Sequence, residues 1–420
     1  MSQSQSENII VRDALVWGKA DPQDLAMQDG KYVQKDDAFL NAGFNEIDAS
    51  GKLCVPAFVD PHIHLDKVLI NESVRVNETG TLTEAIEIIW ERKKHYTVDD
   101  IVDRAGRVIM SAVSNGVTHI RTHVDVDNIG GLLPVQGLIE TRKKYADIVD
   151  LQIVAFPQEG ILQNEGAAEL MKKAMELGAD VVGGMPFNEK SLDDSAKHIE
   201  FAFNLAREFD ADIDMHVDET DDPAAKTLEI LARQTIANDC QGRVTAGHTC
   251  ALAGYTTDYA DEVIQLVKEA QIHMITNPAT NLMLQGRLDE QPKRRGITRV
   301  KELMAEGINV SFGQDCVKDT FYPFGREDPL EIAFLTAHAA HLSQPDEINQ
   351  VFDMPTHNAA RVMRLKNYGT EPGCQADLVI LDAANPAEAI TKQADKNIVI
   401  KRGNIIAEME TRRKILWNPK

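Results

Sequence analysis

Short runs of β-branched and apolar residues alternate along the chain with longer stretches of helical periodicity. From residue 117 onward the β-rich runs recur about every thirty residues, a spacing typical of strand–helix units in a parallel barrel. The runs that predict barrel strands are 54–59, 117–121, 151–155, 180–183, 211–215, 244–246, 273–276 and 308–312. The pattern therefore predicts an α/β protein built on a (β/α)8 TIM-like barrel.

The stretches between these runs predict helices, for example over 166–177 and 193–209. Three glycines follow such stretches, at the position where a left-handed residue ends a helix: Gly116, Gly178 and Gly307. An open doubly wound sheet is the alternative fold. It is disfavoured because neither G-x-G-x-x-G nor G-x-x-x-x-G-K-[ST] follows a predicted strand.

The two ends of the chain have a different pattern. Short strand-like runs occur at 8–16 and 25–33, and again at 377–381 and 398–406, the last with a turn at 401–404. We predict that both ends build one small β-sandwich beside the barrel. The predicted boundaries assign residues 1–55 and 366–420 to this sandwich and residues 56–365 to the barrel.

Composition limits the class of function. The 420 residues include 44 Lys and Arg against 66 Asp and Glu, a net charge of −22 that disfavours nucleic acids and anionic membranes as partners. No apolar run approaches the ~20 residues that span a bilayer, and the first ten residues do not resemble a secretory signal. Five scattered cysteines fit a reducing compartment. We expect a soluble cytoplasmic enzyme for a small molecule, assembled as a homo-oligomer.

Two histidines follow the first predicted barrel strand, in the segment PHIHLD at 61–66. In extended chain, residues i and i+2 point to the same side, so His62 and His64 can converge on one metal ion. Their place at the carboxyl end of a strand favours this interpretation over two unrelated histidines, because barrel active sites lie on that face.

Other predicted strands end in polar residues on the same face. These residues are Gln158 and Glu159 after strand three, His216 and Glu219 at strand five, His248 at strand six, and Asp315 and Cys316 at strand eight. His123, after strand two, lies on the same face and is a possible supporting residue. A set of imidazoles with one carboxylate suits Zn²⁺ or Fe²⁺ better than Mg²⁺ or Ca²⁺. Such an ion makes hydroxide available near neutral pH, so we expect metal-assisted hydrolysis with Glu219 and Asp315 as acid–base candidates.

Longer segments resemble the amidohydrolase superfamily, and within it the bacterial cytosine deaminases, from about residue 55 to 373. The segments that carry the resemblance are PHIHLD at 61–66, RTHVDV at 121–126, DLQIVAFPQEGI at 150–161, QGRL at 285–288 and PKRRGITRVKE at 292–302. The resemblance implies a barrel with a β-sandwich, and one Fe²⁺ or Zn²⁺ per subunit.

Carried over by position, the resemblance implies a role for each candidate residue. The implied metal ligands are His62, His64, His216 and Asp315. Gln158 matches the residue that hydrogen-bonds the amide edge of a pyrimidine, Glu219 the proton shuttle to the ring nitrogen, and His248 the histidine that polarises water. Relatives with two metals carry a lysine after strand four. Residues 181–186 read VVGGMP, so a single metal is expected.

The expected reaction is hydrolytic deamination of an aminopyrimidine, with release of ammonia. An alternative is removal of an amine from an aminotriazine, as in N-isopropylammelide amidohydrolases, which share the His-x-His-x-Asp-Lys segment; Lys67 favours this branch slightly. A non-catalytic scaffold is disfavoured because all four implied ligands are present.

One position departs from the family pattern. Cytosine deaminases commonly have a second aspartate after the metal-binding one, near the substrate ring, whereas this chain has Cys316. A neutral thiol behaves as a small hydrophobe and tolerates a neighbouring methyl group better than a carboxylate does. We therefore predict a 5-substituted substrate such as 5-methylcytosine, against the alternative that cytosine is still preferred.

Overall fold

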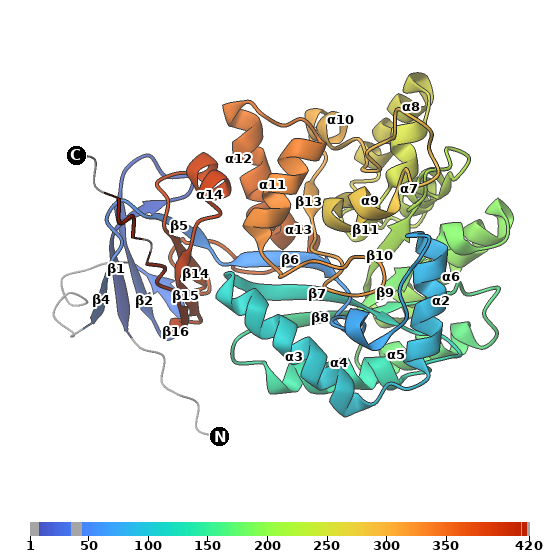
Figure 1. The fold of residues 1–420 in the computed structure, drawn as a ribbon, viewed down its shortest axis with the longest axis horizontal. Coiled ribbons are helices and arrows are strands. Elements are labelled where there is room, and N and C mark those ends of the chain that lie inside the picture. Colours follow the sequence, from blue (N-terminus) through green and yellow to red (C-terminus); the bar gives the residue numbers. More distant parts are fainter. Residues whose placement is uncertain (1–7, 35–43, 413, 418–420) are drawn as a thin grey trace.

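The computed structural model, which describes residues 8–34, 44–412 and 414–417, contains a barrel of parallel strands with a second sheet beside it (Figure 1). The barrel strands follow one another in chain order, each hydrogen-bonded to the next. They are β6 (Phe58–Ile63), β7 (Val117–Asp125), β8 (Asp150–Phe156), β9 (Val181–Gly184), β10 (Asp212–Val217), β11 (Val244–His248), β12 (His273–Thr276) and β13 (Val310–Phe312). An isolated parallel bridge between Ile63 and Asp315 joins the two ends of this sheet. The predicted (β/α)8 barrel is confirmed.

Helices surround the barrel (Figure 1). They are α2 (Leu82–Lys93), α3 (Val98–Ser114), α4 (Leu133–Lys144), α5 (Ala167–Leu177), α6 (Leu192–Phe209), α7 (Thr227–Ala237), α8 (Thr257–Glu269), α9 (Pro278–Leu284), α10 (Val300–Ala305), α11 (Pro329–Ala339), α12 (Pro345–Asp353) and α13 (Ala359–Val362), with α14 (Pro386–Lys392) nearer the second sheet. The helices predicted over 166–177 and 193–209 correspond to α5 and α6 within one residue.

Local sequence explains where these helices begin and end. The Thr97 hydroxyl accepts a hydrogen bond from the Asp100 amide at 3.1 Å, which caps the start of α3. One face of α3 then buries residues at helical spacing, among them Ile101, Val108 and Ile109. At the end of α5, Gly178 adopts φ +112°, which a side chain would disfavour. The predicted role of this glycine as a C-cap is confirmed.

The second sheet is built from both ends of the chain. Its strands are β1 (Ile9–Val16), β2 (Gln23–Gln28), β3 (Lys31–Val33), β4 (Asn45–Asp48), β5 (Leu53–Pro56), β14 (Leu378–Leu381), β15 (Lys396–Lys401) and β16 (Asn404–Glu408). The order is β16-β15-β14-β5-β1-β2-β3, with β4 paired to β1. β14 lies antiparallel to β5, so the two ends of the chain meet in adjacent strands. The predicted β-structure built from both ends of the chain is confirmed. Residues 1–7, which the prediction also assigned to it, lie outside the described part of the chain.

Two predicted strands are each divided in the structure. The prediction of one strand over 54–59 was wrong, because β5 belongs to the terminal sheet and only β6 enters the barrel. Ala57 lies between these two strands, and its backbone amide donates to the carbonyl of Asp377. The chain passes from the terminal sheet to the barrel at this residue. The run 25–33 is likewise a hairpin of β2 and β3. Asp29 and Gly30 both have positive φ at its turn, as a tight hairpin requires.

No helix among the described residues is long and apolar enough to cross a membrane.

Candidate active site

The implied metal ligands converge at the carboxyl ends of the barrel strands. His62 lies in β6, His64 one residue beyond it, His216 in β10 and Asp315 after β13. The His64 and His216 Nε2 atoms are 3.0 Å apart, and Asp315 Oδ1 lies 3.4 Å from His64 Nε2 and 3.6 Å from His62 Nε2. All four side chains are buried. The fold therefore brings together residues that are up to 253 positions apart, as His62 and Asp315 are.

The donor atoms of this cluster fit a divalent cation. The Nε2 atom of His62 has no hydrogen-bond partner among the described residues, and the Nε2 atoms of His64 and His216 face each other at 3.0 Å. Burial, followed by the nearby charge of Lys67, lowers the pKa of His64 well below its ordinary value. A neutral imidazole is the form that binds a metal. Three nitrogen donors and one carboxylate oxygen are typical ligands of Zn²⁺ or Fe²⁺.

The orientation of His64 is set by a hydrogen bond on the side of the ring that faces away from the cluster. Its Nδ1 lies 3.1 Å from the carbonyl oxygen of His123 and donates to it, which leaves Nε2 as the acceptor that faces the cluster. Such support of a metal-binding histidine by a carbonyl fixes both the ring and its tautomer. His123 therefore acts through its backbone, and its ring packs against His62 with centroids 4.2 Å apart.

Glu219 and His248 form a buried pair beside the cluster. His248 Nδ1 lies 3.1 Å from Glu219 Oε1, and the Asn281 amide donates to the same carboxylate oxygen at 3.0 Å. Burial by itself lowers the pKa of His248, but the charges of Glu219 and Asp315 outweigh it and raise this pKa to about 9. The imidazole thus lies against the Glu219 carboxylate beside the cluster, which suits it to bind and polarise water or an oxygen of the ligand.

A small pocket opens onto these groups. Its lining residues come from most of the barrel loops and are His64, Leu82, Phe156, Gln158, Met185, His216, Glu219, Thr280, Asp315, Cys316 and Phe321. Gln158 and Cys316 thus share one cavity with three of the cluster residues. Burial raises the pKa of the Cys316 thiol well above its ordinary value, so this thiol is uncharged.

Two residues that support the site were not predicted. Asn281, in α9, orients Glu219, and Lys67 donates to the Gln158 side-chain oxygen at 2.8 Å. Asn281 lies five positions after the last residue of β12. It is therefore a polar residue beyond the carboxyl end of a strand, like the predicted site residues, but it lies further along the chain than they do. Lys67 was noted in the sequence only because it slightly favours the aminotriazine branch. Its contact with Gln158 depends on tertiary packing.

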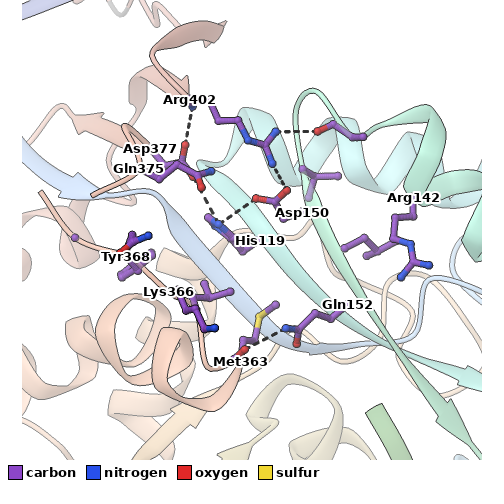
Figure 2. A pocket seen from close by; sticks show the side chains of 16 residues that line it. His119, Arg142, Asp150, Gln152, Met363, Lys366, Tyr368, Gln375, Asp377 and Arg402 are labelled. Carbon is purple, nitrogen blue, oxygen red and sulfur yellow. Dashed lines mark hydrogen bonds and ion pairs between the residues drawn. The ribbon is translucent and has the colours of Figure 1, made fainter. Parts of the chain in front are cut away.

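A larger pocket lies at the opposite end of the barrel, between the first residues of β7 and β8 and the terminal sheet (Figure 2). His119 lines this pocket, with Nε2 3.3 Å from Asp150 Oδ2 and 3.6 Å from Asp377 Oδ2. Lys401 Nζ contacts both carboxylates, at 2.7 and 2.9 Å, so its ammonium group supplies the positive charge between them. This cluster joins the two sheets, and residues at this end of a barrel generally contribute to stability rather than catalysis.

The geometry of the barrel and its site agrees with comparisons to known proteins. The sequence profile described as amidohydrolase family matches residues 45–407, and the chain belongs to this family. It is therefore a hydrolase that acts on C–N bonds. Enzymes of the family generally use a divalent metal, and the cluster around His62 is a group that could bind one.

Individual relatives differ in their named substrates. A crystal structure of 5-methylcytosine deaminase from Klebsiella pneumoniae with 5-fluorocytosine is 39% identical, with a TM-score of 0.92 and coverage of 97% of this chain and 99% of the other. N-isopropylammelide isopropyl amidohydrolase from Pseudomonas sp. (strain ADP) is 30% identical over 97% of this chain and 99% of its own. Pterin deaminase from Rhizobium rhizogenes is 30% identical over 84% of this chain and 80% of its own.

Proposed function

We propose that this protein is a metal-dependent hydrolytic deaminase of an aminopyrimidine base, with 5-methylcytosine or another 5-substituted cytosine as substrate. The observation that carries the proposal is the neutral, buried Cys316 thiol beside Asp315 in a small pocket. The likeness to 5-methylcytosine deaminase over nearly the whole chain supports the same substrate class.

In the proposed reaction, water replaces the exocyclic amine of the ring. The new C–O bond forms at the amine-bearing carbon, the C–N bond breaks, one water proton stays on the adjacent ring nitrogen and the other leaves with ammonia. His62, His64, His216 and Asp315 would hold one Fe²⁺ or Zn²⁺, which supplies Lewis-acid activation of water when bound.

The acid–base steps fall to Glu219 and His248. Glu219 is proposed to deliver a proton to the ring nitrogen beside the reacting carbon, because its carboxylate lines the pocket and is oriented by the Asn281 amide. His248, held by Glu219 Oε1 at 3.1 Å, is proposed to polarise the attacking water. Asp315 Oδ2, which has no hydrogen-bond partner among the described residues, is a base that can take a proton from the water.

Two lining residues are proposed to select the ring. Gln158, which lines the pocket, is proposed to hydrogen-bond the amide edge of the pyrimidine. Cys316 is proposed to contact the ring carbon that carries the 5-substituent. A methyl group in an apolar pocket contributes about 1–3 kcal/mol to discrimination, which is enough for a clear preference.

A second candidate function is removal of an alkylamine from an aminotriazine. It is favoured by the 30% identity to the N-isopropylammelide enzyme, which extends over 97% of this chain. The same metal cluster and acid–base pair would serve both reactions, so the two functions differ in the ring that the pocket accepts.

The test is amine release from 5-methylcytosine, cytosine, N-isopropylammelide and pterin by the zinc-loaded and iron-loaded protein. We expect the highest kcat/KM for 5-methylcytosine, and we expect Cys316→Asp to lose that preference relative to cytosine. Cys316→Ala, which keeps the position uncharged, is the matched control and should retain it. No turnover of the methylated base by wild type, or an unchanged preference in Cys316→Asp, would contradict the proposal.

A further inference from the structure

Lys67 is a buried cation in direct contact with the side chain of Gln158. Its side chain has no exposed surface, and Nζ donates to Gln158 Oε1 at 2.8 Å and to Asp125 Oδ1 at 2.6 Å. An ammonium group donates hydrogen bonds and cannot accept them. The Gln158 amide can therefore satisfy this neighbour only with its oxygen turned toward Lys67.

The other end of the Gln158 amide meets an acceptor. Gln158 Nε2 donates to Glu159 Oε1 at 3.3 Å, and that oxygen also accepts from Lys93 Nζ at 3.1 Å. A flipped amide would place N–H groups against Lys67 and a carbonyl oxygen against the Glu159 carboxylate. Both contacts would be repulsive in a buried site, where unmatched polar groups are costly.

We propose that Lys67 is a positioning residue that locks the Gln158 amide in this single orientation. Nε2 carries a second N–H, which the lock makes available as a donor to a ligand in the pocket that Gln158 lines. The site then selects a ring with a carbonyl group at the edge facing Gln158. It rejects the same ring with an amino group there, because two donors would face each other. This inference rests on the proposed placement of a ring substrate against Gln158.

Lys67 and Lys93 share one carboxylate. Asp125, the ion-pair partner of Lys67, also contacts Lys93 Nζ at 2.7 Å. Lys93 further contacts Asp127 at 2.5 Å and Glu159. Of the two buried lysines, Lys67 is the one that touches the side-chain oxygen of Gln158, which makes Lys93 a matched control within the same network.

The test measures the affinity of zinc-loaded protein for uracil and for isocytosine by calorimetry. The two rings differ at the carbon between the ring nitrogens, which carries oxygen in uracil and an amino group in isocytosine. We expect wild type to prefer uracil by at least about tenfold, the value of one well-placed hydrogen bond to a buried partner. Lys67→Met should abolish most of this preference, whereas Lys67→Arg, which keeps a cationic donor, and Lys93→Met should keep it.

A second variant makes the result independent of whether Lys67→Met folds. Gln158→Met keeps Lys67 but removes the donor without adding a charge beside Glu159, so the preference for uracil should be lost. An unchanged preference for uracil in Gln158→Met, or in folded, zinc-containing Lys67→Met, would overturn the inference, as would wild type that binds both rings equally or neither.

Failure of the proposed function is recognised separately. Protein that prefers uracil in binding but releases no ammonia from aminopyrimidines contradicts the function and leaves the role of Lys67 intact. Protein that deaminates 5-methylcytosine without a preference for the 2-oxo ring contradicts the role of Lys67 alone.

Discussion

His62 and Asp315 are joined by a backbone hydrogen bond, and their side chains face each other. The amide of Asp315 donates to the carbonyl of His62 at 2.8 Å, and His62 Nε2 lies 3.6 Å from Asp315 Oδ1. The amide of His64 returns a hydrogen bond to the carbonyl of Asp315 at 3.1 Å. The contact that closes the barrel between its first and last strands is thus the one that assembles the candidate metal centre. Barrel closure and metal binding should therefore stabilise each other.

We expect one divalent ion per chain to be necessary for activity, and its removal to lower thermal stability. The buried donor atoms lose their partner when the ion leaves, and an ion present at 1,000 times its Kd contributes about 4 kcal/mol to the free energy of unfolding. The measurements are elemental analysis, activity after chelation, and the Tm of metal-free and reloaded protein. Two tightly bound ions per chain, or full activity without metal, would contradict this.

Glu219→Gln should fold and bind its metal, yet lose most of its turnover. Glutamine keeps the shape and the contact with Asn281 but cannot carry the proton, and a positioned acid–base group contributes about 10²–10⁴-fold to the rate. The prediction is checked by kcat together with the metal content of the variant. A near-normal kcat would assign the proton transfer to Asp315 alone.

Asn281→Leu should lower kcat about 10–100-fold with little change in metal content, an effect typical of residues that orient catalytic groups from behind. The exchange removes the amide that donates to Glu219 Oε1 and lies 3.1 Å from His248 Nδ1. Asn204→Leu, the same exchange on an exposed part of α6, is the control and should leave kcat unchanged. Wild-type kcat in Asn281→Leu would show that Glu219 is positioned without this contact.

Acid should destabilise the protein partly through His119, at the junction of the two sheets (Figure 2). Burial, followed by the charge of Lys401, lowers the pKa of His119 to about 4. Below the ordinary pKa of about 6.5, the unfolded chain binds a proton at this residue and the folded chain does not. Stability therefore falls as the pH drops from about 6.5 to 4, with a contribution of up to about 3 kcal/mol from this residue.

The variant His119→Gln keeps a donor toward the carboxylates but cannot titrate. Its free energy of unfolding, measured with denaturant between pH 7 and pH 4, should decrease less steeply than that of wild type. His95→Gln, at an exposed position, is the control and should follow the wild-type curve. Parallel curves for wild type and His119→Gln would exclude His119 as a source of acid sensitivity.

Much of the fold follows from local features of the sequence. The βα repeat, the glycine at the end of α5 and the two-residue spacing of His62 and His64 act within a few positions of the chain. They predict the barrel and the face on which polar groups gather. The same local rule failed at 54–59, because the pattern of apolar residues is equally suitable for either sheet. Pairing with β14, more than 300 positions away, assigns β5 to the terminal sheet.

By itself, then, the sequence determined the type of barrel and the residue types at the ends of its strands, because both depend on interactions between near neighbours in the chain. The tertiary structure alone decided which atoms meet. The 3.0 Å approach of His64 to His216, the orientation of Glu219 by Asn281 and the contact of Lys67 with Gln158 join different strands and loops. Such distances depend on strand register and on the packing of the whole barrel, since a hydrogen bond is lost over a shift of about 1 Å.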